Sequence, residues 1–243
     1  MRNLLPLVAF VLLFSCDSAS DCFQRSGEMT SKEIAVGEFD MINIGEDIEL
    51  VIRKGEHHTV VIHSGSNLID DISAKMVGTE LYIKNDNGCN MSRGYNNTKV
   101  YVTTPELTKI YSASQFSVSS EGILDYPNLV LHAALFDKTA SGTFHLNVNC
   151  QVLTIEDNAS AFFQISGQTI DCSVNFYDGN ARFDGAHLSA ENVYIFQRST
   201  NDMVIKPSQS VSGKIYSTGN VVLKSVPPII DVEQLYTGRV IYP

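Results

Sequence analysis

From Leu107 to Pro243 the sequence repeats a pattern of about 20 residues, in which an apolar strand start is followed by a polar corner and a second apolar stretch. A repeat of this length is too short for a helical hairpin and matches one coil of a β-solenoid. The strand starts, each about one repeat after the last, are Ile110, Leu131, Ile155, Phe176, Ile195 and Ile215. The corners that follow are rich in Ser, Asn, Asp and Gly, which tolerate tight turns and positive φ. The repeat therefore predicts an all-β fold of stacked parallel coils.

The segment before the repeat predicts shorter strands with less regular spacing. Residues 41–44, 48–52, 59–63, 81–84 and 99–103 alternate apolar and polar side chains, and turn signals separate them. No linker interrupts the spacing of the strands, so residues 34–243 are expected to form a single domain. An open solenoid end exposes unpaired strand edges, and we therefore expect these strands to form the first, less regular coils or a cap.

The N-terminus carries an export signal. Arg2 precedes an apolar run from Leu4 to Phe14, which is too short to cross a bilayer as a permanent helix. The following Ser15 and Cys16 complete a Leu-Phe-Ser-Cys motif that resembles the bacterial lipobox. This resemblance implies a signal peptide over residues 1–15, acyl chains on Cys16, and a lipidated tether over residues 16–33. The alternative is an ordinary secreted protein that is cleaved near residues 18–20.

Four cysteines remain once Cys16 is lipidated, an even number that favours disulfides in an oxidising compartment. Cys150 and Cys172 are separated in the sequence by close to one coil. Because adjacent strands lie ~4.8 Å apart, we predict that these two cysteines are bridged or stacked in neighbouring coils. Cys22 and Cys89 would then tie the tether to the folded domain. The alternative is that all four are free buried thiols.

Composition and motifs argue against several functional classes. The formal net charge is −10 at pH 7, with acidic residues scattered along the chain, and such a surface repels nucleic acid. The sequence contains no Cys-x-x-Cys, Gly-x-Ser-x-Gly, P-loop or His-Glu-x-x-His motif. His57, His58 and His63 cluster, but His57 and His58 face opposite sides of an extended strand. We therefore predict no metal, no cofactor and no catalytic residue.

Several motifs occur in a specific order between residues 39 and 110. They are Phe39-Asp40-x-Ile42-x-Ile44-x-x-x-Ile48-x-Leu50-x-Ile52-x-x-Gly55, Val60-x-Ile62, Gly78-Thr79-x-Leu81-x-Ile83 and Val100-x-Val102-Thr103-x-Pro105-x-Leu107-x-x-Ile110. In this order the chain resembles the putative auto-transporter adhesin, head GIN domain family (DUF2807), although Ser-Ala-Ser at 112–114 replaces the family's usual glycine-containing corner. The resemblance covers nearly all of the chain after residue 16. It implies a right-handed parallel β-solenoid in an exported protein or lipoprotein of Bacteroidota type, and it supplies no catalytic motif.

Aromatic residues recur one position after the strand starts of three successive coils. If the strand starts point inward, Tyr177, Phe196 and Tyr216 point outward and form a strip, with Asp178 and Gln197 beside them as polar partners. Such a strip suits stacking against sugar rings or burial against another subunit. The alternative is a structural role in which the strip packs beneath a loop or terminal segment.

Asp157 and Asp178 recur in neighbouring coils and allow two interpretations: a carboxylate pair for calcium or acid–base chemistry, or caps for corner amides. On balance the sequence favours a membrane-anchored, non-enzymatic binding or adhesion module of the cell envelope, held at the outer membrane and facing the periplasm or the exterior. Its partner would be a glycan or a cell-envelope protein. The alternative is a carbohydrate-active enzyme, a lyase or hydrolase, because β-helices host many such activities.

Overall fold

The computed structural model describes residues 23–88, 98–133 and 140–243, which form strands joined by short corners. The first nine strands are β1 (Met29–Ile34), β2 (Met41–Ile44), β3 (Glu49–Lys54), β4 (Thr59–Gly65), β5 (Ile72–Val77), β6 (Glu80–Asn85), β7 (Lys99–Thr104), β8 (Lys109–Ser112) and β9 (Val118–Asp125). The others are β10 (Asn128–Ala133), β11 (Thr143–Asp157), β12 (Phe162–Phe176), β13 (Arg182–Gln197), β14 (Met203–Ile205), β15 (Pro207–Ile215), β16 (Val221–Leu223), β17 (Ile229–Gln234) and β18 (Val240–Ile241). A 3₁₀ turn, η2 (Ile69–Asp71), follows β4.

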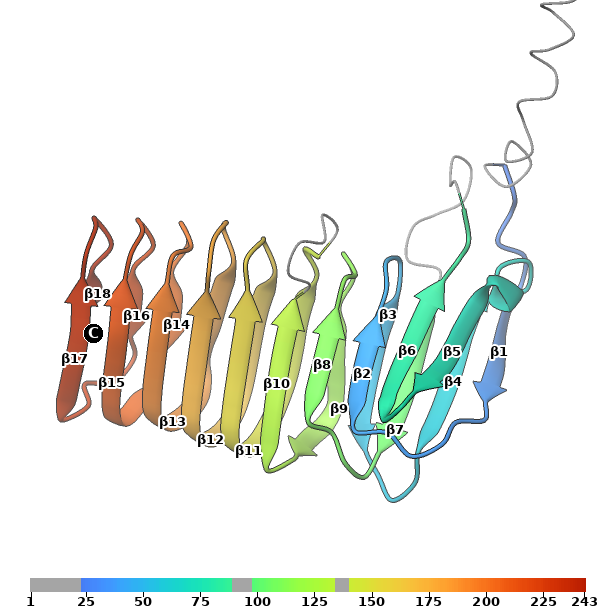
Figure 1. The fold of residues 1–243 in the computed structure, drawn as a ribbon, viewed down its shortest axis with the longest axis horizontal. Coiled ribbons are helices and arrows are strands. Elements are labelled where there is room, and N and C mark those ends of the chain that lie inside the picture. The colour runs from blue at the N-terminus through green and yellow to red at the C-terminus, as the bar shows by residue number, and fades with distance from the viewer. Residues whose placement is uncertain (1–22, 89–97, 134–139) are drawn as a thin grey trace, which may run out of the picture.

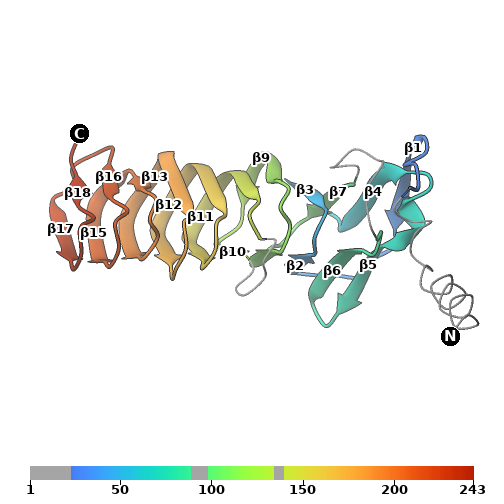
Figure 2. The same ribbon diagram turned by 90° about the horizontal axis from the view of Figure 1, so that it is seen from above.

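The strands stack into a solenoid of about six turns with two faces (Figures 1 and 2). Face 1 contains β5, β6, β2, β8, β10, the C-terminal parts of β11, β12 and β13, then β15 and β17. Face 2 contains β1, β4, β7, β3, β9, the N-terminal parts of β11, β12 and β13, then β14, β16 and β18. From β8 onward every pairing is parallel, which confirms the predicted all-β solenoid.

The N-terminal strands form two parallel layers, β2 with β3 and β6 with β7, and an antiparallel cap. β2 and β3 pair in parallel with β8 and β9 on one side and with β6 and β7 on the other, so the first coil of the chain is not the end of the stack. Beyond it, β5 pairs with β6, and β4 with both β7 and β1, in antiparallel orientation. The antiparallel strands cover the end of the solenoid, as expected for edges that must be protected.

The register between coils differs from the predicted alignment at two positions. Leu131 pairs with both Ile110 and Ile155, as predicted. Ile155 then pairs with Val174 rather than Phe176, and Ile195 pairs with Gly213 rather than Ile215. Both errors are slips of two positions. Because side chains alternate with a period of two, such a slip leaves the inward and outward pattern unchanged and is invisible in the sequence.

Inward side chains from both faces fill a continuous apolar core. At its centre the rings of Phe144 and Phe163 stack with centroids 4.7 Å apart, and Phe163 lies 6.0 Å from Phe176. These phenylalanines are at most 1% exposed. They come from segments that are brought together only by the coiling of the chain, so the aromatic stack ties successive coils to one another.

The predicted bridge between Cys150 and Cys172 does not form, because both are free, buried thiols. Cys150 pairs in register with Thr169, and Cys172 pairs with Leu153. The local coil is shorter than the sequence separation of the two cysteines, so Cys172 lies farther along β12 than the position opposite Cys150. Burial raises the pKa of Cys150 to about 11 and that of Cys172 to about 12, which keeps both thiols protonated. Cys16, Cys22 and Cys89 lie outside the described residues.

Candidate functional site

Three aromatic rings come together on the outer surface of face 1. The centroids of Tyr177 and Phe196 are 5.6 Å apart, and those of Phe196 and Tyr216 are 4.9 Å apart. Tyr177 is 36% exposed and Tyr216 37%, while Phe196 is half-buried between them. The strand partners of Phe196 are Asn175 and Lys214. Tyr177 and Tyr216 each come two residues after one of these partners, so their rings reach Phe196 diagonally.

Polar contacts extend this surface toward the N-terminal coils. The hydroxyl of Tyr177 donates a hydrogen bond of 2.8 Å to Glu156. The other carboxylate oxygen of Glu156 lies 3.7 Å from Nδ1 of His132, whose ring is 5.2 Å from that of Tyr111. We call Tyr111, His132, Tyr177, Phe196 and Tyr216 the aromatic row. Its members lie along face 1 in the order of the coils.

Electrostatics fix the protonation of two members of the aromatic row. Burial, together with the hydrogen bond to Glu156, raises the pKa of Tyr177 to about 12, so its hydroxyl remains a donor. Burial and the charge of Lys109 lower the pKa of His132 despite the nearby Glu156. The imidazole of His132 is therefore neutral at pH 7, and this part of the row is flanked by the carboxylate of Glu156 and the ammonium of Lys109.

A fourth exposed ring, Tyr194, adjoins the aromatic row and was not predicted. It is 46% exposed and borders a shallow groove of about 260 Å³. In that groove the amide of Asn192 donates to Asp171 at 3.0 Å and Ser210 donates to Asn192 at 2.8 Å. Tyr194 precedes Phe196 by two positions on one strand, so the two share a face. That spacing is the signal from which the sequence could have identified Tyr194.

The two predicted polar partners of the strip have different positions. Asp178 is exposed and accepts a hydrogen bond of 2.8 Å from the amide of Gly179. Gln197 is fully buried, where it accepts from the amide of Ser199 at 3.1 Å and donates to the carbonyl of Asn201 at 2.8 Å. The prediction for Gln197 was therefore wrong, because a residue two positions after inward-facing Ile195 also points inward.

Asp157 acts as a corner cap. Its side chain is fully buried and accepts hydrogen bonds from the amides of Ala159 at 2.6 Å and Ala161 at 2.8 Å. Burial raises the pKa of Asp157 to about 6, although the amide hydrogen bonds oppose that shift. A fully buried Asp157 cannot contact a ligand at the surface, so the capping interpretation of Asp157 and Asp178 holds over the carboxylate pair.

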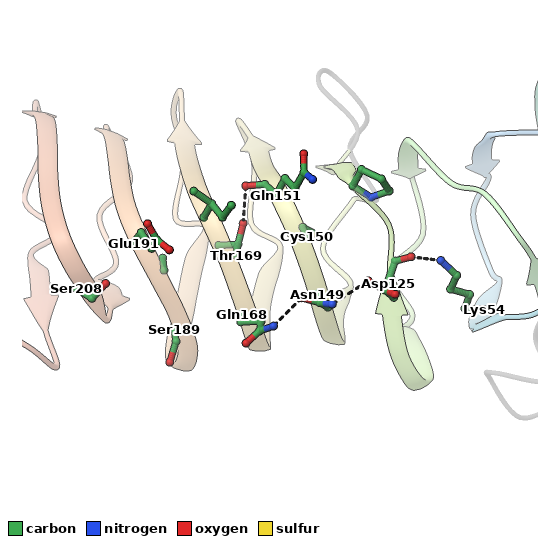
Figure 3. Close-up of a pocket in the computed structure, with 13 residues that line it drawn as sticks. Lys54, Asp125, Asn149, Cys150, Gln151, Gln168, Thr169, Ser189, Glu191 and Ser208 are labelled. Carbon is green, nitrogen blue, oxygen red and sulfur yellow. Dashed lines mark hydrogen bonds between the residues drawn. The ribbon is translucent and has the colours of Figure 1, made fainter.

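A second candidate site is a groove of about 570 Å³ along the corner where face 2 turns into face 1 (Figure 3). Asn149 donates to the carboxylate of Asp125 at 2.8 Å, and Gln168 donates to Asn149 at 2.8 Å, which makes a polar ladder across three coils. Lys54 binds the backbone carbonyl of Asp125 at one end, and Glu191 and Ser208 line the other. Hydrogen bonds therefore hold the polar groups of Asp125, Asn149 and Gln168 in a line across neighbouring coils.

The histidine cluster serves packing. The ring of His58 lies 4.6 Å from that of Phe39 and its Nδ1 is 3.2 Å from the hydroxyl of Thr104, while the ring of His63 lies 4.8 Å from that of Tyr101. In the part of the chain that the structure describes, no group of three or more His, Cys, Asp or Glu side chains is arranged to bind a metal ion. Within the same residues no helix is long and apolar enough to cross a membrane.

Comparisons with known proteins give one matching family model and several solved structures of the same fold. The model of the putative auto-transporter adhesin, head GIN domain family matches residues 38–227. A crystal structure of a putative adhesin from Bacteroides fragilis has a TM-score of 0.82 at 17% identity, covering 90% of this chain and 100% of the other.

Two further crystal structures show the same fold. A putative adhesin and a putative lipid binding protein, both from Parabacteroides distasonis, have TM-scores of 0.60 and 0.59 at 14% and 13% identity. Each covers 90% of this chain, and the chain covers 100% and 99% of them respectively. No curated protein matches the chain significantly. At these identities the structural similarity establishes the fold alone.

Proposed function

Because the chain belongs to the putative auto-transporter adhesin, head GIN domain family, we propose that it is a non-enzymatic adhesion module of the cell envelope that binds its ligand through the aromatic row. The family supports a binding or adhesion role at the cell surface or envelope. The observation that carries the proposal is the contact of three exposed or half-exposed rings, Tyr177, Phe196 and Tyr216, on the outside of a rigid solenoid.

The chemistry of face 1 favours an uncharged glycan as the ligand. Aromatic faces stack against the apolar faces of sugar rings, and Tyr194 adds a fourth ring beside Asp171, Asn192 and Ser210, whose polar groups are held by mutual hydrogen bonds. Groups fixed on a solenoid lose little conformational entropy on binding. The net charge of −10 disfavours anionic polysaccharides, so a neutral glycan fits best.

A carbohydrate-active enzyme remains the second candidate because the corner groove is long and polar. Asp125 and Glu191 are its two carboxylates, and they lie at opposite ends of the lining. The side chain of Asp125 is already bound by Asn149, which favours a structural role. Reducing-end release from a panel of neutral polysaccharides by the intact protein would support the enzyme and contradict a purely binding role.

Replacing Tyr177, Phe196 and Tyr216 together with alanine should reduce glycan binding at least tenfold and leave the thermal midpoint of unfolding within a few degrees. The rings lie outside the core, so their loss removes stacking area without opening a cavity. A glycan array followed by calorimetry measures the first effect, and thermal denaturation measures the second.

The matched control is Tyr101→Ala on face 2, which removes one half-buried ring and should leave binding unchanged. Binding that survives the triple replacement, or that is lost equally in the control, would contradict a contact surface on the aromatic row. Unfolding of the triple variant would show instead that the row is structural.

The membrane anchor is part of the same proposal. The lipobox-like Leu-Phe-Ser-Cys motif places acyl chains on Cys16, and the polar segment that follows would hold the solenoid away from the membrane. Mass spectrometry of the membrane fraction should yield an acylated N-terminal peptide that begins at Cys16, and Cys16→Ala should abolish this modification. A soluble mature protein with an unmodified N-terminus at another residue would contradict the anchor.

A further inference from the structure

The two ends of the solenoid differ (Figures 1 and 2). At the N-terminal end the antiparallel strands β1, β4 and β5 cover the stack. At the opposite end β17 pairs only with β15 and β18 pairs only with β16 among the described residues. The outer edges of β17 and β18 therefore present backbone N–H and C=O groups that can accept another strand.

The same end exposes apolar side chains. Ile230, Val232 and Val240 are the last layer of the core and are only partly buried. The residues around them are 42–62% exposed: Val226, Ile229, Leu235, Tyr236, Ile241 and Tyr242. Exposed apolar residues that gather at one place on a surface mark an interaction site. Unpaired strand edges beside this patch point to a partner that adds strands.

We propose that a second copy of this chain covers this end, so that two solenoids join C-terminal end to C-terminal end. At the N-terminal end the parallel stack gives way to antiparallel strands, so a head-to-tail contact would not continue the parallel coils. Two copies that meet through identical ends form a twofold dimer that closes and does not grow into a filament. This inference is independent of the proposed glycan binding.

Charge decides which strands meet. If β17 runs antiparallel to β17 of the second copy, with Val232 opposite its own copy, then Asp231 lies opposite Glu233. Like charges directly opposite each other are destabilising. If β17 instead runs antiparallel to β18 of the second copy, with Val232 opposite Val240, then Glu233 lies opposite Arg239. Sliding this pairing by two positions places Asp231 opposite Arg239, again with unlike charges.

The pairing of β17 with β18 therefore satisfies both the core and the charges, and the twofold axis makes the contact twice. Ile230 then lies opposite Tyr242 of the second copy, which covers two of the exposed or partly exposed apolar residues. The guanidinium of Arg239 already donates to the carbonyls of Tyr236 and Gly238, which holds it at the edge of the last coil. Glu233 reaches Lys214 at 2.8 Å and remains about half exposed.

The test uses the full chain in a density-matched detergent, so that any lipid anchor is held in micelles, and measures mass by sedimentation equilibrium. The wild type should be a dimer. Glu233→Arg alone and Arg239→Glu alone should each raise the dimer dissociation constant at least tenfold, because each variant faces its own copy with two like-charge contacts.

An equimolar mixture of the two single variants should recover dimers, since both contacts between the unlike chains pair opposite charges. Glu233→Arg also removes the contact of Glu233 with Lys214 within the chain, whereas Arg239→Glu keeps it. Arg239→Glu, with its fold checked by circular dichroism, therefore controls for loss of the dimer through that contact. A wild type that stays monomeric at about 0.1 mM overturns the proposal. So does a dimer that neither variant weakens, or a mixture that fails to recover.

Discussion

Replacing Phe163 with alanine should lower the free energy of unfolding by about 3–5 kcal/mol, the range for deleting a fully buried phenylalanine. The ring of Phe163 is 0% exposed and lies between Phe144, at 4.7 Å, and Phe176, at 6.0 Å. The backbone on either side is held by parallel pairing with β11 and β13, so the coils cannot close the cavity. Denaturant unfolding followed by circular dichroism measures the loss.

Phe162→Ala is the matched control for this prediction. Phe162 is the preceding residue of the same strand, points outward and packs beneath the guanidinium of Arg182 at 4.9 Å. Its loss should cost about 1 kcal/mol, the worth of a partly exposed cation–π contact and a little apolar area. Equal destabilisation by the two variants would contradict the assignment of inward and outward positions along β12.

Gly213→Ala should destabilise the C-terminal coils by roughly 2–5 kcal/mol, the sum of an unfavourable backbone conformation and overpacking. Gly213 has a φ of 126°, a region in which L side chains are strained. A Cβ at this position would overlap the carbonyl oxygen of Ile195, its strand partner in the preceding coil. Alanine can be accommodated only by separating β13 from β15.

Hydrogen exchange measures this effect better than a global melt, because a solenoid loses stability coil by coil. Protection should fall in β15–β18 and be retained in β11 and β12. The control is Gly78→Ala, where φ is also positive, at 63°, but no atom lies within 4 Å of a Cβ. That variant should cost only about 1 kcal/mol, from the backbone alone. Similar losses in both variants would mean that the close approach of the coils at Gly213 is unimportant.

The position of the aromatic row shows how much of the candidate site the sequence could predict. The alternation of side chains along a strand was enough to place Tyr177, Phe196 and Tyr216 outside the core. The same rule applied to Tyr194 and Gln197 would have added the first residue and removed the second. The proximity of His132 to Glu156 follows from the correctly predicted pairing of Leu131 with Ile155, because each of the two residues comes one position after a strand start.

The sequence by itself determined the solenoid, its family and the division of each strand into core and surface positions. These properties depend on a period of about 20 residues along the chain and a period of two along each strand, both of which are local. They survive a slip of two positions, which is why Phe176 and Ile215 could be aligned in place of Val174 and Gly213 without changing the predicted fold.

Only the tertiary structure decided the register between coils, and with it every property that depends on which residues are neighbours. It left Cys150 and Cys172 unbridged, inserted the coil of β2 and β3 inside the stack, and ended the stack in antiparallel strands on one side and in the parallel β17 and β18 on the other. The physical reason is that parallel pairing joins residues about one coil apart through backbone hydrogen bonds, which are the same for every side chain. Corner length and packing against the neighbouring coil select the partner, and neither is encoded in the period of the sequence.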